Sequence, residues 1–78
     1  PFQAVWDGKK LAEFRKDDRG FAVRDYLELR EWAPESQLYT GREVTARITH
    51  IARGPFVPEG FAMLSIKVLD KRIKRPEP

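Results

Sequence analysis

Two apolar stretches restrict this chain to a fold built on paired strands. The segment between them can form neither a helix nor a central strand. From Glu43 to Ile51, apolar and polar residues alternate, which is typical of a strand with one buried face. Phe61 to Val68 is almost continuously apolar and is predicted to lie in the centre of a sheet. Between them, residues 54–60 hold two prolines and two glycines, so this segment is predicted to be a loop.

A third strand is predicted from Ala12 to Lys16, where apolar and charged residues alternate. Ala12 and Phe14 share one face, which we expect to hold the segment against the core. Glu13 and Arg15 share the other face, which we expect to point outward as neighbours. Residues 17–20 (Asp-Asp-Arg-Gly) then form a turn by residue type.

A fourth strand is predicted from Tyr26 to Trp32, with its leucines on one face and its polar residues on the other. Residues 33–40 contain Pro34 and read as a polar connection that ends in a turn at Thr40 and Gly41. His50 follows the inward positions of the next strand, where a histidine is usually structural and hydrogen-bonded.

One short helix precedes the strands. In residues 1–8, Phe2, Val5 and Trp6 have helical spacing and Gly8 is suited to cap the C-terminus. A helix this short is unstable alone, so its aromatic side chains must dock on the sheet. The fold class is therefore mainly β, or α+β: a curled sheet or small β-barrel with one short N-terminal helix.

The chain length of 78 residues allows one domain with a modest core. We assign residues 1–70 to this domain. Residues 71–78 lack core-forming side chains apart from Ile73 and are predicted to be a mobile basic tail.

The charge of the chain points to a local binding site. The net charge of +3 is too small for a domain that binds nucleic acid by charge alone. However, residues 8–20 contain five basic and three acidic residues among a few apolar ones, which predicts fixed charges of both signs lining a cleft. If nucleic acid is the ligand, we expect a single pocket to bind it.

Lys10 and Arg15 are the leading candidates to hold a phosphate or a carboxylate, with Lys16 and Arg19 as further basic contacts. The alternative is that Arg15 only pairs with Glu13 or Asp17 on a wet surface. Glu13 either accepts hydrogen bonds from a base amino group or only orients Arg15.

Trp32 and Tyr26 lie on the polar face of their strand with Arg30, and exposed aromatics beside arginine are suited to base stacking. The alternative is that Trp32 closes one end of a barrel. Phe56, on the proline-rich loop, is either a lid over the cleft or a plug in the barrel.

Several classes of protein are not expected. The chain has no cysteine and one histidine, so a metal site is not predicted, and no cofactor is expected. No apolar run is long enough to cross a bilayer, and no signal peptide is visible, so we expect a cytoplasmic protein without a membrane partner. The oligomeric state is left open.

The order of these blocks resembles the ASCH family of the PUA-like superfamily, and within it a small bacterial and phage group of the DUF3850 type. The spacing Gly8, Lys10, Glu13, Arg15 is short, and it is specific in this order with the other blocks. The other blocks of the resemblance are residues 2–10, 13–16, 18–25, 27–32, 39–42, 48–51 and 60–66.

The resemblance implies a PUA-like β-barrel with a cleft at the helix–strand junction that binds RNA, lined by Lys10, Glu13 and Arg15. The family's usual first strand would lie before Pro1, so we expect a native product that is longer at its N-terminus. Arg24 stands where the family commonly has glycine, so its turn must either avoid a left-handed conformation or carry strain.

Two other functions remain open. Some ASCH proteins resemble amidohydrolases acting on N4-acetylcytidine-like substrates, with a lysine matching Lys10 and a threonine nucleophile at the position of Glu13. Here Lys10 and Glu13 are catalytic candidates only if the carboxylate acts as a general base, because it is a poor replacement for an alcohol nucleophile. The second alternative is a protein-interaction module.

Overall fold

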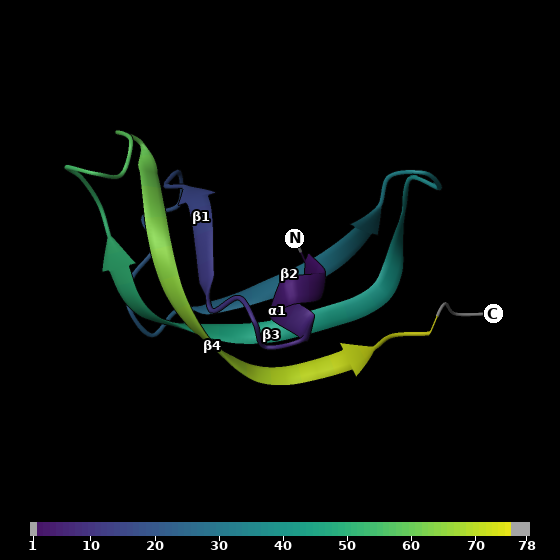
Figure 1. The fold of residues 1–78 in the computed structure, drawn as a ribbon. Helices are drawn as coiled ribbons and strands as arrows, with labels where there is room; N and C mark the ends of the chain where they lie inside the picture. Colours follow the sequence, from purple (N-terminus) through teal and green to yellow (C-terminus); the bar gives the residue numbers. More distant parts are fainter. Residues whose placement is uncertain (1, 76–78) are drawn as a thin grey trace.

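The computed structural model describes residues 2–75. Four antiparallel strands curl into a half-barrel, with one short helix beside them (Figure 1). The sheet order is β1-β4-β3-β2, so the two longest strands form its centre. The elements are α1 (Phe2–Trp6), β1 (Ala12–Lys16), β2 (Tyr26–Ala33), β3 (Leu38–Ala52) and β4 (Phe61–Ile73).

The sheet curls because its central ladder contains irregularities. Between β3 and β4 the register shifts twice, leaving Leu69 and Thr49 without a direct partner. Such bulges bend a strand and increase its twist, which turns a flat ladder into a half-barrel. The core lies on the inner face and contains ten buried side chains: Val5, Phe21, Leu27, Leu29, Val44, Ala46, Ile48, Ala62, Leu64 and Ile66.

The helix ends just before Gly8, as its sequence predicts. Gly8 has a φ of 73°, its N–H donates to the Val5 carbonyl, and the Lys9 N–H donates to the Ala4 carbonyl at 2.8 Å. This pair of bonds is the Schellman motif, which requires a left-handed residue after the helix. Phe2 and Trp6 pack against the core, as their helical spacing predicts. Pro1, the first residue of the predicted helix, lies outside the described residues.

The turn predicted at Thr40 and Gly41 is wrong. β2 continues to Ala33 and β3 begins at Leu38, so only residues 34–37 connect them. Trp32 pairs with Tyr39 and their rings meet edge to face at 5.0 Å, which extends the ladder beyond the predicted strand ends. Gly41 lies within β3, and the backbone of Lys74, just after β4, comes too close to leave room for a Cβ there. The Gly41 carbonyl accepts a hydrogen bond from the Lys74 N–H at 2.7 Å.

The predicted tail begins too early. Lys71, Arg72 and Ile73 continue β4 and pair with Val44, Glu43 and Arg42. Arg72 also binds the side chains of Glu28 and Glu43 across the sheet. These polar contacts hold a segment whose only apolar residue is Ile73, so hydrophobicity alone does not predict it. Residues 76–78 of the predicted tail lie outside the described residues.

Two inward positions were also predicted wrongly. His50 is exposed, because the bulge at Thr49 reverses the alternation of β3 beyond Ile48. Phe14 is exposed on the outer face of β1, where it stacks on Phe61. The proline-rich segment 54–60 is a loop, as predicted. Phe56 at its tip is 98% exposed, so it neither covers a cleft nor fills the barrel.

The turn before β2 carries a left-handed arginine. Arg24 has a φ of 80°, and the Asp25 N–H donates to the Ala22 carbonyl at 3.1 Å, as in a type II turn. Two backbone hydrogen bonds fix this turn to Ile48. The Arg24 N–H donates to the Ile48 carbonyl, and the Ile48 N–H donates to the Asp25 carbonyl, both at 2.8 Å. The turn is therefore held in a conformation that favours glycine.

Replacing Arg24 with glycine is expected to raise the free energy of unfolding by about 0.5 to 1 kcal/mol. Removing Cβ relieves the left-handed strain, and the greater freedom of glycine in the unfolded chain offsets part of the gain. Urea denaturation measures the change. Arg24→Ala is the matched control, because it removes the guanidinium and keeps Cβ; a glycine variant no more stable than the alanine variant would show that the turn is not strained.

Candidate binding pocket

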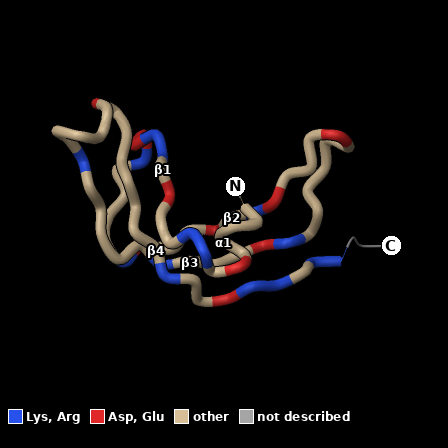
Figure 2. Tube along the Cα trace, viewed as in Figure 1, with Lys and Arg blue, Asp and Glu red and all other residues tan. Residues whose placement is uncertain are grey.

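A pocket of about 250 Å³ opens between α1, β1 and β2. We call it the α1–β1 pocket. Three basic residues and one acidic residue line it together with three apolar ones: Lys10, Glu13, Arg15, Arg30, Phe2, Val5 and Leu29. Along the rest of the chain, basic and acidic residues are spread over all the strands (Figure 2). Charges of both signs with an apolar floor make this pocket the candidate binding site.

The register of β1 turns two of its three charged residues inward. Glu13 pairs with Leu64 and Arg15 pairs with Ala62, and both partners are fully buried. Because directly opposite residues of a ladder share a face, Glu13 and Arg15 lie on the inner side of the half-barrel. The predicted outward position of this pair is therefore wrong. Phe14, on the other face, gains an aromatic partner in Phe61 instead of a place in the core.

Glu13 lies between two cations. Its Oε1 is 3.5 Å from Lys10 Nζ, and its Oε2 is 3.5 Å from Arg15 Nε. The Glu13 side chain is only 16% exposed, whereas those of Lys10 and Arg15 are 35% and 39% exposed. The carboxylate therefore orients the two basic groups while leaving both accessible to a ligand.

Arg30 brings a third cation to the pocket from β2. Its Nε is 3.6 Å from Glu43 Oε2, and its guanidinium lies 3.9 Å above the centre of the Tyr39 ring. Arg30 also lines a neighbouring hollow with Tyr39 and Glu43. A cation held by an aromatic face and one carboxylate still has free N–H groups for an anionic ligand.

The other predicted binding residues lie apart from this pocket. Trp32 packs against the edge of Tyr39 and does not line the pocket. Lys16 is exposed on the outer face of β1, and Arg19 lines a separate hollow with Tyr26 near the Arg24 turn. The structure thus brings together Lys10, Glu13, Arg15 and Arg30 out of the seven predicted residues.

Arg42 fixes the helix that forms one wall of the pocket. Its Nε and Nη2 donate to Glu31 at 2.9 and 2.6 Å, and Nη2 also donates to Gln3 Oε1 at 2.7 Å. The guanidinium lies 5.0 Å from the Trp6 ring centre and 5.5 Å from that of Phe2. Sequence reasoning missed Arg42, because its partners are 11 and 39 residues away.

The hydrogen bonds from Arg42 and Thr40 lower the pKa of Glu31, and the same carboxylate raises the pKa of Arg42. Both shifts have one physical cause, a charge-assisted contact that favours the ionised forms of both partners. This ion pair therefore stabilises the folded state while Glu31 is ionised.

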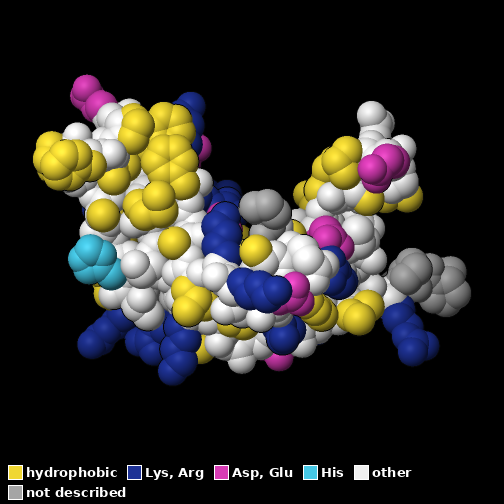
Figure 3. Space-filling model, in the orientation of Figure 1, with side chains coloured by type: hydrophobic (Ala, Val, Ile, Leu, Met, Phe, Trp, Pro, Cys, Tyr) yellow, Lys and Arg dark blue, Asp and Glu magenta, His cyan; other side chains and the backbone are white. Residues whose placement is uncertain are grey.

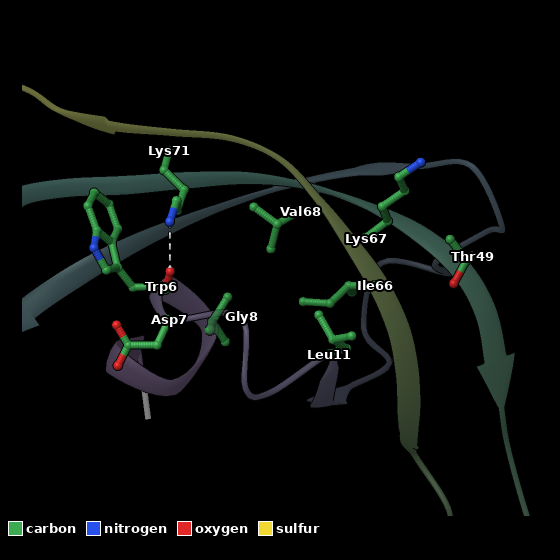
Figure 4. Close-up of a pocket in the computed structure, with 10 residues that line it drawn as sticks. Trp6, Asp7, Gly8, Leu11, Thr49, Ile66, Lys67, Val68 and Lys71 are labelled. Carbon is green, nitrogen blue, oxygen red and sulfur yellow. Dashed lines mark hydrogen bonds between the residues drawn. The ribbon is translucent and has the colours of Figure 1, made fainter.

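A second, more apolar hollow of about 480 Å³ lies on the other side of α1 (Figure 4). Trp6, Leu11, Ile66 and Val68 contribute apolar surface to it. Lys71 crosses it, donating from Nζ to the Trp6 carbonyl at 3.1 Å, so this lysine caps the helix end instead of remaining free. This hollow is a weaker candidate for an anionic ligand, because its lining is mainly apolar and Lys71 already donates to the helix.

Within residues 2–75, no group of three histidine, cysteine or carboxylate side chains is arranged to hold a metal ion. None of the described helices has the length and hydropathy needed to span a membrane.

Comparison with known proteins gives two matches. Residues 1–66 match the model of a family described as a domain of unknown function, DUF3850. A protein of Escherichia phage P2, described as an uncharacterized 12.9 kDa protein in the GpA 3′ region, is 50% identical over 50 residues. The match covers 64% of this chain and 44% of the phage protein, so it spans less than half of that relative's length.

Glu31→Gln is expected to destabilise the protein most at neutral pH. Because the folded state lowers the pKa of Glu31, its stabilising contribution is present above the unfolded-state pKa and is lost as pH falls through the lowered value. The difference in unfolding free energy between wild type and variant should therefore shrink in urea titrations as the pH falls below the ordinary glutamate pKa of 4.5.

Glu35→Gln, in the exposed turn after β2, is the matched control and should stay within about 0.5 kcal/mol of wild type at neutral pH. A Glu31→Gln difference that is constant or larger in acid would contradict the role of this ion pair.

Proposed function

The chain belongs to the DUF3850 family, and from the chemistry of the α1–β1 pocket we propose that it binds single-stranded RNA, or a nucleotide of such RNA, in the cytoplasm. The observation that carries this proposal is the grouping of Lys10, Arg15 and Arg30 around one shielded carboxylate, Glu13. Three cations and one carboxylate line the pocket, and although Glu43 pairs with Arg30 from outside the lining, positive charge remains in excess and attracts an anion. The pocket also keeps an acceptor for donor groups on the same ligand.

The roles of the residues follow from their chemistry. Lys10 and Arg15 are partly exposed and hold a phosphate group, the arginine through two parallel N–H donors. Glu13 accepts a hydrogen bond from the amino group of a base. Phe2 and Leu29 supply apolar surface for the base itself. The pocket volume of about 250 Å³ suits one nucleotide unit better than a duplex.

Local binding is also consistent with the charge of the whole chain. The net charge of +3 is small, and three basic residues outside the pocket are paired with carboxylates: Arg42 with Glu31, Arg53 with Asp17 and Arg72 with Glu43. A single pocket would neutralise few phosphates, so binding should depend only weakly on salt.

We also propose that the half-barrel is of the PUA-like type found in ASCH domains. A curled antiparallel sheet with the helix beside β2, and with a pocket between that helix and β1, supports this relationship. So does the basic pocket at the helix–strand junction, where the ASCH resemblance expects a cleft.

A second candidate function is hydrolysis of an acyl group on a nucleoside amine. Lys10 Nζ and Glu13 Oε1 lie 3.5 Å apart in the pocket. Glu13 would take a proton from water as the oxygen attacks the acyl carbon, and Lys10 would stabilise the oxyanion. The carbon–nitrogen bond then breaks, the amine leaves with a proton, and a carboxylic acid is released.

RNA binding can be tested with a labelled single-stranded oligonucleotide of about eight nucleotides, a length within the usual site size for such proteins. Lys10→Ala and Arg15→Ala should each weaken binding about tenfold, because each removes a charge-assisted contact. For two or three neutralised phosphates, the logarithm of the affinity should fall with the logarithm of the salt concentration with a slope of about −1.4 to −2.

Arg19→Ala and Lys67→Ala are matched controls that remove the same charge outside the α1–β1 pocket, and binding should stay within about twofold of wild type. An affinity that does not depend on salt, or that falls equally in all four variants, would overturn the proposal. The absence of measurable binding at low salt would overturn it as well.

Hydrolysis is tested by release of acetate from N4-acetylcytidine. Activity should disappear in both Lys10→Ala and Glu13→Gln while thermal unfolding stays cooperative. If wild type releases no acetate, the second candidate is excluded and the binding proposal is unaffected.

A further inference from the structure

β1 leaves one of its edges free. It pairs with β4 on one side, and no described strand pairs with the other. The direction of its backbone groups follows from the ends of the ladder. The Ile66 N–H donates to the Leu11 carbonyl at 3.0 Å, and the Asp17 N–H donates to the Gly60 carbonyl at 2.8 Å. Leu11 and Asp17 are therefore at hydrogen-bonded positions toward β4, as are the odd-numbered residues between them.

The even-numbered residues consequently direct their N–H and carbonyl groups away from the sheet. These residues are Ala12, Phe14 and Lys16, and their backbone groups form a row of unpaired donors and acceptors along the free edge. Such an edge is a template for pairing with another strand.

We propose that β1 pairs antiparallel with β1 of a second copy of this chain, across a two-fold axis at Phe14. In this register Phe14 of one copy exchanges both backbone hydrogen bonds with Phe14 of the other. Ala12 likewise exchanges two with Lys16 of the second copy. Every unpaired backbone group of the row then has a partner, and the arrangement closes as a dimer.

The charges of the inner face select this register. With the axis at Phe14, Glu13 of each copy stands opposite Arg15 of the other. If the axis moved to Glu13, two glutamates would face each other. If it moved to Arg15, two arginines would face each other, with Glu13 opposite Asp17. Opposite charges directly across a ladder stabilise it and like charges destabilise it, so the sequence of β1 is self-complementary in one of these three registers.

The outer face adds apolar surface to the same contact. Phe14, Phe61 and Met63 are 47%, 37% and 38% exposed, and the first two rings stack with centres 5.1 Å apart. Figure 3 shows apolar side chains gathered over this end of the molecule. The pairing would place the two Phe14 side chains side by side and join two stacked pairs into one cluster of four rings.

The pairing also extends the α1–β1 pocket. Glu13 and Arg15 line that pocket, so Arg15 of the second copy would stand at its border. The two pockets of a dimer would then adjoin across the axis. This proposal does not depend on RNA binding, because it rests on the edge of β1 alone.

The test uses two charge reversals and the mass in solution, measured by sedimentation over increasing protein concentration. Wild type should shift from monomer to dimer. Glu13→Arg and Arg15→Glu should each lose at least tenfold in dimer affinity, because each sets like charges opposite each other twice. An equimolar mixture of the two variants should form a heterodimer, since every opposing pair in it has opposite charges. The double variant should recover a homodimer.

A backbone variant tests the edge itself. Ala12→Pro removes an N–H that points away from β4, so the intramolecular ladder keeps its bonds while the dimer is lost. Circular dichroism and thermal unfolding verify that each variant is folded. Lys67→Glu reverses an exposed charge on β4 and should leave the dimer affinity unchanged.

Three results would overturn the proposal. Wild type that remains a monomer at millimolar concentration would mean that the edge is left open or is covered by another protein. A dimer that persists in Ala12→Pro, or that responds to Lys67→Glu as strongly as to the β1 reversals, would place the interface elsewhere. Failure of the two single variants to associate with each other while wild type dimerises would exclude this register.

Discussion

The ladder between β3 and β4 is the constraint on which the rest of the structure depends. It runs from Arg42 paired with Ile73 to Ala52 paired with Met63. β1 attaches to one of these strands and β2 to the other, and neither has another partner among the described strands. Because the two bulges bend this ladder, they also decide how β1, β2 and α1 approach one another. The pocket between these three elements is a consequence of that bend (Figure 1).

Placing charges on the inner face of β1 has two effects on so small a protein. It reduces the apolar area that β1 buries, and the core is drawn mainly from the other strands and Val5. In return, a carboxylate and two cations are held in fixed relative positions beside the core. Arg42 completes the arrangement, because it fastens α1 through both its aromatic side chains and Gln3. The pocket therefore has one wall fixed by the ladder and one by an ion pair.

Local sequence patterns were sufficient to predict burial and element ends wherever a residue's environment depends on its near neighbours in the chain. Val44, Ala46 and Ile48 are buried as their alternation predicts, and Gly8 ends the helix. Patterns failed where a partner far along the chain decided the outcome. Thr49 has no direct partner in the ladder with β4, and His50 beyond it is exposed. Hydrophobicity gave no sign that Arg72 would extend β4, because its partners are carboxylates on β2 and β3.

By itself, the sequence determined the kinds of element and the neighbours within them, including the closeness of Lys10, Glu13 and Arg15. Those relations depend on side-chain periodicity, which is a local property of the backbone. Only the tertiary structure decided that β1 turns its charged face inward. The sequence leaves open which face of β1 is turned toward the core, because residues alternate along the strand on both faces. The register with Ala62 and Leu64 decides between the two faces. The tertiary structure also brought Arg30 to the pocket and Arg42 to the helix, because contacts between distant segments form only when the sheet curls.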